Sequence, residues 1–135
     1  MSLTAKTIRF YCRNFAASNQ ITRWKPRAGN DNRHTLPRFT TEAIRADTRI
    51  INELQQWGRT RGMTSSQAAL GWLLHKAPYI VPIPGTTKES HLLENIHTLT
   101  FDIPDSDWLA LENAVASIPV VGDRYNAEQQ KQVGF

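Results

Sequence analysis

The sequence predicts an α/β fold of the kind that is built around a parallel sheet. Two observations carry this prediction: stretches with helical periodicity flank a continuous apolar run, Tyr79–Ile83, and the connections between them are short. Helices and strands that alternate along the chain with short loops are typical of parallel sheets. One clear strand and one weak strand cannot close a barrel, so the chain is expected to be part of a larger fold.

Two helices are predicted before the apolar run. Thr40-Thr41-Glu42 supplies a capping hydroxyl and an acid for the first turn of the first helix, and Gly62 closes that helix. Thr64 and Gln67 form a capping box at the start of the second helix, which is apolar on most sides and should be well buried. Pro78 stops it. The apolar face of the first helix consists of Ile44, Ile50, Ile51, Leu54 and Trp57.

The run Tyr79–Ile83 is predicted to be a parallel strand covered on both faces, because it does not alternate with polar residues. Pro82 would remove one hydrogen bond from its ladder. Two helices should follow, one from Lys88 to about Ile96 and one from Asp105 to Ser117. One face of the first of these is expected to be buried, and it carries Leu92, Ile96 and Leu99.

Charge is distributed unevenly along the chain. Residues 1–38 hold eight Lys and Arg against one acid, a net +7, whereas residues 39–135 carry a net −3. We therefore expect residues 1–30 to be a basic, weakly structured or degenerate segment and residues 31–135 to be the folded part. The side chains of residues 7–13 alternate in character with a period of two, which indicates a weak strand at Thr7–Arg13. Three interpretations of the basic segment stay open: a nucleic-acid contact, a transit peptide, and no specific role, which is ranked first.

The composition narrows the function classes. Hydrophobic residues at 40% and charged residues at 21% fall in the range of globular domains. The single cysteine, Cys12, cannot form an internal disulfide, and no secretory signal or membrane-length apolar run is present. A cytoplasmic location without a membrane partner is the expectation, and no metal-ligand set is indicated.

The stretch from Ile80 to Asn95 combines a strand, a tight turn and the start of a helix. Gly85 has no Cβ, so a ligand can approach the backbone closely. Thr86, Thr87 and Lys88 offer hydroxyls, N–H groups and an ammonium at the positive end of a helix, which is how an anion site is made. In an arbitrary protein the same residues are more often a plain turn and cap.

Four polar residues of this helix share one face. Lys88, His91, Glu94 and Asn95 occur at i, i+3, i+6 and i+7. This arrangement fits an adenine nucleotide, with phosphate at the helix N-terminus and the base near Glu94 and Asn95. The alternative, that Glu94 and Asn95 are ordinary surface positions, stays open.

These motifs resemble those of the aldo-keto reductase family. Ile83-Pro84-Gly85-Thr86-Thr87-Lys88, followed by His91-Leu92 and Glu94-Asn95, is similar to the end of the barrel in that family. The likeness extends to Arg61-Gly62-Met63-Thr64 with Gln67–Leu74, and outward to Leu36-Pro37-Arg38-Phe39 and Gly122-Asp123-Arg124-Tyr125.

The resemblance implies the C-terminal portion of a (β/α)8 TIM barrel: an incomplete barrel of mostly helices with one or two parallel strands. The intact family transfers hydride from NADPH to carbonyl groups. By the family pattern, Thr87, Lys88 and His91 would meet the 2′-phosphate of NADP. Gly85 and Thr86 would lie along the phosphate path, and Glu94 and Asn95 would meet the adenine. Family members more often have Arg where this chain has His91.

Departures from the family pattern limit the expected activity. A complete barrel needs ~250 residues, and the family's catalytic Asp, Tyr, Lys and His come from strands that this sequence does not match. No catalytic residue is therefore assigned, and a truncated chain with residual or lost NADP binding is expected. Its expected partners are NADPH and, through exposed apolar faces, other copies of itself. The alternative is a basic, non-catalytic interaction module that binds nucleic acid or acidic partners through residues 1–38.

Overall fold

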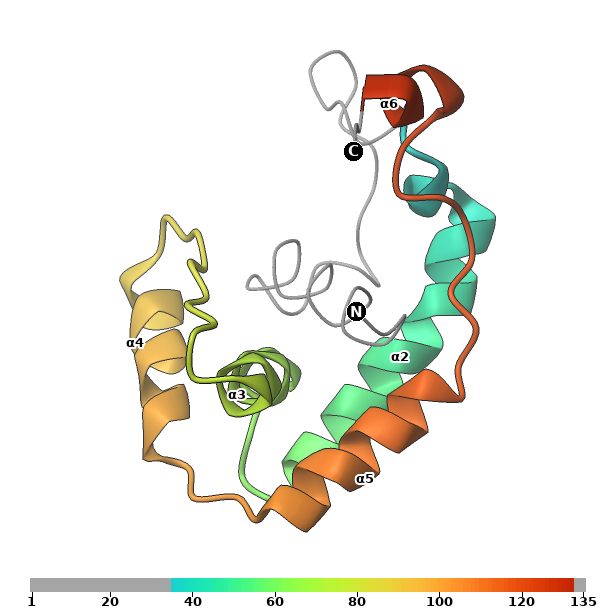
Figure 1. The fold of residues 1–135 in the computed structure, drawn as a ribbon. Coiled ribbons are helices and arrows are strands. Elements are labelled where there is room, and N and C mark those ends of the chain that lie inside the picture. The colour runs from blue at the N-terminus through green and yellow to red at the C-terminus, as the bar shows by residue number, and fades with distance from the viewer. Residues whose placement is uncertain (1–34, 133–135) are drawn as a thin grey trace.

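The computed structural model describes residues 35–132, which form helices joined by irregular connections (Figure 1). In this part of the chain there is no β-strand. The weak strand predicted at Thr7–Arg13 lies outside the described residues. In chain order the elements are η2 (Pro37–Phe39), α2 (Thr41–Arg59), α3 (Ser65–Lys76), α4 (Glu89–His97), η3 (Thr98–Thr100), α5 (Asp105–Ala116) and α6 (Ala127–Gln132).

The first long helix, α2, begins and ends as its sequence predicts. The Thr40 side chain accepts a hydrogen bond from the Ala43 N–H at 3.2 Å, which caps the first turn. Past its C-terminus, Gly62 has a φ of +70°, a conformation that glycine adopts without steric cost. On the helix itself, Ile50, Leu54 and Trp57 are buried.

The second helix, α3, is the most buried element and lies between α2 and α4 (Figure 1). Its predicted capping box is confirmed: the Gln67 N–H donates to Thr64 Oγ1 at 3.2 Å, and the Thr64 N–H donates to Gln67 Oε1 at 3.0 Å. The predicted burial is confirmed as well. The core around α3 consists of Ile50, Leu54, Trp57, Met63, Ala68, Ala69, Trp72, Leu73, Trp108, Leu111 and Val115.

Helix α5 packs beside the C-terminal half of α2 (Figure 1). The rings of Trp57 and Trp108 lie 4.9 Å apart between centroids. Arg61 links the end of α2 to the start of α5. Its Nη2 lies 2.6 Å from Asp107 Oδ2, and its guanidinium lies over the Trp57 ring. Gly71 of α3 lies so close that a Cβ there would come within 2.6 Å of the Trp108 ring.

After α5 the chain runs back along α2 to its N-terminal end, where α6 lies (Figure 1). The Val121 N–H donates to Asp47 Oδ1 at 3.1 Å, and Arg38 Nε donates to the Gly122 carbonyl at 3.0 Å. Helix α6 was not predicted, although Asn126 provides its cap by accepting from the Gln129 N–H. The short η2 was not predicted either.

The strand predicted at Tyr79–Ile83 is wrong. A turn at residues 78–79 is followed by a connection without a sheet partner, and Tyr79, Val81 and Ile83 are 84%, 79% and 92% exposed. A strand requires a neighbour to complete its ladder, and the described residues provide none. The parallel strands expected of a barrel portion are therefore not present in this part of the chain.

The orientation predicted for α4 is also wrong. Leu92, Ile96 and Leu99, which were expected to be buried, are exposed, whereas Asn95 and Thr98 are buried. Among the described elements, α4 and η3 contact α3, so the face that turns toward α3 is the one that is covered. An apolar helix face is buried only where another element covers it. No helix of the described residues is long and apolar enough to span a membrane.

Candidate functional site

The backbone of the turn before α4 is accessible at Gly85. Gly85 is exposed, and a Cβ built there would meet no atom within 4 Å. The Thr86 side chain fixes the backbone of the next two residues. Its Oγ1 accepts from the Lys88 N–H at 3.1 Å and lies 3.3 Å from the Lys88 carbonyl oxygen. Thr87 is exposed beside it. The backbone of this turn is thus ordered by its own threonine and remains accessible.

Lys88 is the N-cap residue of α4, and no side chain caps the helix there. The first N–H groups of a helix have no partner within the helix, and in the part that the structure describes no partner is found for those of Glu89 and Ser90. The Lys88 side chain is exposed and forms no ion pair with a described residue. An ammonium and two open N–H groups therefore meet at one point, a combination that attracts anions.

Glu94 is tied to the start of α3. Its Oε1 accepts a hydrogen bond from the Thr64 hydroxyl at 2.6 Å, and its backbone carbonyl accepts from Gln67 Nε2 at 3.0 Å. Gln67 Nε2 also lies 3.4 Å from His97 Nδ1. The capping box of α3 thereby fixes the position of α4. Local sequence spacing carries no signal for this contact, because 27 to 30 residues separate the partners.

Asn95 is the buried residue of α4, with 8% of its surface exposed. Neither Oδ1 nor Nδ2 of its side chain has a hydrogen-bond partner within the described chain, and the same holds for the buried Thr98 Oγ1. A buried polar group without a partner costs about 1–3 kcal/mol. A carbonyl oxygen and an NH2 group are the pair that can read the N7 and N6 atoms of adenine, and in this structure both of these Asn95 atoms are enclosed.

The seven predicted site residues therefore lie on one connection and one helix. Exposure decreases along the shared face from Lys88 through His91 to Asn95. Seven residues of helix span about 10 Å, so the cationic end and the unpaired amide are separated by a nucleotide-sized distance. Glu94 departs from the predicted arrangement, since one of its carboxylate oxygens is used by Thr64.

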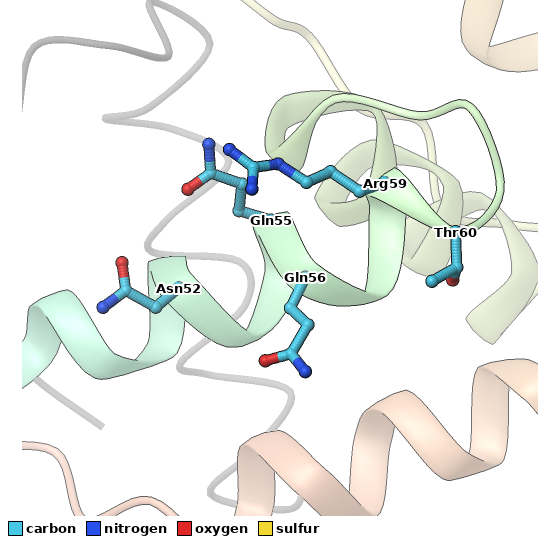
Figure 2. A pocket seen from close by; sticks show the side chains of 5 residues that line it. All are labelled: Asn52, Gln55, Gln56, Arg59 and Thr60. Atoms are coloured by element: carbon cyan, nitrogen blue, oxygen red, sulfur yellow. The ribbon is translucent and has the colours of Figure 1, made fainter.

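A second feature is a hollow of about 410 Å³ along the C-terminal half of α2 (Figure 2). All of its side chains rise from the last turns of α2 and its C-cap, and they are exposed. None of the predicted site residues lines this hollow, and Arg59 is the one charged side chain among its lining residues. Its lining residues are Asn52, Gln55, Gln56, Arg59 and Thr60.

Comparisons with known proteins match the chain to one family. The sequence model of the Aldo/keto reductase family matches residues 4–116. A probable aldo-keto reductase of Glycine max is 34% identical over 89 residues, which is 66% of this chain and 26% of that protein. An aldo-keto reductase of Strobilurus tenacellus is 27% identical over 95 residues, which is 70% of this chain and 28% of that protein.

The chain thus spans about a quarter of the length of these relatives. No solved structure matches it. The family implies a TIM-barrel fold. The elements of this fold that the structure describes are helices. The resemblance recognised in the turn before α4 is confirmed by the family match, and the chain belongs to the aldo/keto reductase family.

Proposed function

We propose that residues 31–135 are the NADP-binding, C-terminal portion of an aldo-keto reductase, and that the 135-residue chain binds NADPH without reducing carbonyl compounds. The observation that supports the proposal is the start of α4, where Lys88 is exposed at the N-cap, without an ion-pair partner among the described residues, beside the open N–H groups of Glu89 and Ser90. An ammonium and open backbone donors at the start of a helix are what binding of a phosphate group requires.

Each site residue has a role in this proposal. Lys88 and the N–H groups of the first turn of α4 hold the 2′-phosphate, with Thr87 and His91 beside them. Gly85 and Thr86 let the remaining phosphates lie along the open turn. Asn95, which is buried beside α3, is assigned to the adenine edge by the family pattern alone, and Glu94 acts chiefly by fixing α4 on α3.

The chain itself supplies no group for the chemical step. NADPH, if bound in a complete barrel, would supply the hydride for a carbonyl carbon. Protonation of the carbonyl oxygen needs a positioned acid, and the family resemblance assigns none of the family's catalytic residues to this chain. The chain's contribution is to bind and orient the nucleotide.

Titration with NADPH, followed by tryptophan emission, tests the proposal. We expect a saturable change with NADPH and weaker binding of NADH, because only NADPH carries the 2′-phosphate. Lys88→Met should remove this preference. Lys131→Met on α6 is the matched control, and it should leave both titrations unchanged. An emission signal that does not respond to millimolar NADPH contradicts the proposal.

A second function is retained for residues 1–38 because of their net charge of +7. As a basic interaction module, they would bind nucleic acid or another acidic surface by releasing counterions. Such binding weakens steeply with salt. Deleting residues 1–30 should then abolish retention on an acidic matrix, and a shortened chain that is still retained contradicts this function.

A further inference from the structure

The side-chain amide of Gln67 lies between α3 and α4, and only 4% of the residue's surface is exposed. Two backbone groups fix its orientation. Its Oε1 accepts from the Thr64 N–H at 3.0 Å, and its Nε2 donates to the Glu94 carbonyl oxygen at 3.0 Å. Because the first contact requires an oxygen and the second an NH2 group, the amide cannot be turned over without losing both hydrogen bonds.

The amide has a second N–H group, and the ring of His97 lies next to it. The distance between Gln67 Nε2 and His97 Nδ1 is 3.4 Å. Since an NH2 group offers donors only, a hydrogen on Nδ1 would point at another hydrogen across this distance. Nδ1 therefore fits as an acceptor, and the ring hydrogen of neutral His97 belongs on Nε2. The orientation of one buried amide thus fixes the tautomer of His97.

The surroundings of His97 agree with this tautomer. No ion pair joins His97 to an acid among the described residues, and a carboxylate oxygen of Glu94, one turn earlier, is bound by the Thr64 hydroxyl. The ring of Phe101 meets the imidazole at 90°, with centroids 5.1 Å apart. The Thr100 hydroxyl donates to the His97 carbonyl oxygen at 2.9 Å. Among the described residues, no carboxylate therefore calls for a hydrogen on Nδ1.

We propose that His97 is a positioning residue for α4. As the neutral Nε2–H tautomer it accepts the second N–H of Gln67 at Nδ1, and this contact holds the C-terminal end of α4 against α3. Without that acceptor, a donor of the buried Gln67 amide would be left unpaired, which is unfavourable. His97 is exposed, so its contribution comes from this hydrogen bond and from Phe101, and not from burial in the core.

The consequence for nucleotide binding rests on the proposed function. Lys88 and the open N–H groups lie at the start of α4, about 13 Å along the helix axis from His97. Helix α4 has nine residues, and so short a helix is marginal in water by itself. Its order depends on its contacts with α3, which lie toward its C-terminal end. Loosening that end should therefore also disorder the first turn, where a phosphate group would bind.

The acceptor is tested by two substitutions of His97 in the full chain. His97→Asn keeps an acceptor at the same number of bonds from Cα, whereas His97→Leu removes it. Without nucleotide, hydrogen exchange in His97→Leu should be faster at the amides of α4 and unchanged at those of α2, and His97→Asn should match the wild type. The Kd for NADPH should rise about fivefold in His97→Leu and stay at the wild-type value in His97→Asn.

The tautomer is tested by 15N NMR of the histidine ring nitrogens at about pH 8, where an ordinary imidazole is neutral. His97→Asn identifies the His97 signals by their loss. In the wild type, Nε2 should carry the hydrogen and Nδ1 should not. Gln67→Glu retains an acceptor for the Thr64 N–H but replaces the NH2 group by a carboxylate oxygen, so Nδ1 should become protonated. Far-UV circular dichroism checks that this variant is folded.

Several results overturn the inference. A hydrogen on Nδ1 in the wild type does so, as does a folded Gln67→Glu chain in which Nδ1 stays unprotonated. If Gln67→Glu does not fold, the exchange rates decide: equal rates in His97→Asn and His97→Leu mean that the acceptor does not position α4. The same Kd for NADPH in the wild type and both variants refutes the effect on binding. A wild-type chain that does not bind NADPH contradicts the proposed function alone, because the exchange and NMR measurements need no nucleotide.

Discussion

The hydroxyl of Thr64 donates to the carboxylate of Glu94 over 2.6 Å, and the same hydroxyl accepts from the Gln67 N–H. One side chain therefore caps α3 and anchors α4. The site residues on α4 are held in place by a capping residue that comes 30 positions earlier in the chain. The orientation of the proposed nucleotide site and the stability of α3 should consequently change together.

Thr64→Val should lower the free energy of unfolding by about 1–2 kcal/mol, because it removes a helix cap and the donor to Glu94. Glu94→Gln retains an acceptor for the Thr64 hydroxyl and should cost clearly less. Urea denaturation followed by circular dichroism measures both. Equal midpoints for wild type and Thr64→Val would show that this hydroxyl does not stabilise the fold.

Asn95→Leu should have opposite effects on stability and on binding. Replacing the unpaired buried amide by an apolar side chain of similar size should raise the free energy of unfolding by about 1–2 kcal/mol. The same change removes the groups proposed to read adenine, so the NADPH titration should show weaker binding. Thermal denaturation and the emission titration are the measurements. A destabilised Asn95→Leu that still binds NADPH would contradict both the unpaired state and the assigned role.

His91→Arg should tighten NADPH binding roughly tenfold, a change of about 1.4 kcal/mol. Arginine carries a permanent charge and can bind a phosphate with two hydrogen bonds. NADH binding should not change, because NADH has no 2′-phosphate. The control is Leu93→Arg, which adds the same charge at an exposed position of the same helix. If Leu93→Arg is equally effective, the gain is general electrostatic attraction and His91 is not at the phosphate.

Gly71→Ala should destabilise the chain by about 1–3 kcal/mol, although alanine favours a helix. The added methyl would lie 2.6 Å from the Trp108 ring. That ring also contacts the rings of Trp57 and His75 at centroid distances of 4.9 and 5.7 Å, so it has little room to move. Gly85→Ala is the control for unfolding measurements, because its methyl meets no atom within 4 Å. A Gly71→Ala midpoint equal to that of the wild type would show that the core can relax around α3.

The sequence predicted features that depend on interactions over three or four residues. The cap at Thr40, the capping box of Thr64 with Gln67, and the closing glycine at Gly62 occur where they were expected. The family was also recognisable from the residues around Gly85, and the family match confirms it. The roles assigned to the seven site residues stay predictions, which the NADPH titrations test.

Contacts between distant segments determined what the sequence could not. An apolar run such as Tyr79–Ile83 becomes a strand only if a neighbour accepts its hydrogen bonds, and the described residues offer none. The face of α4 that is buried was likewise decided by the position of α3, which covers Asn95 and leaves Leu92 and Ile96 exposed. Periodicity reveals that a helix has two faces. Which of them is covered depends on the elements that pack against it.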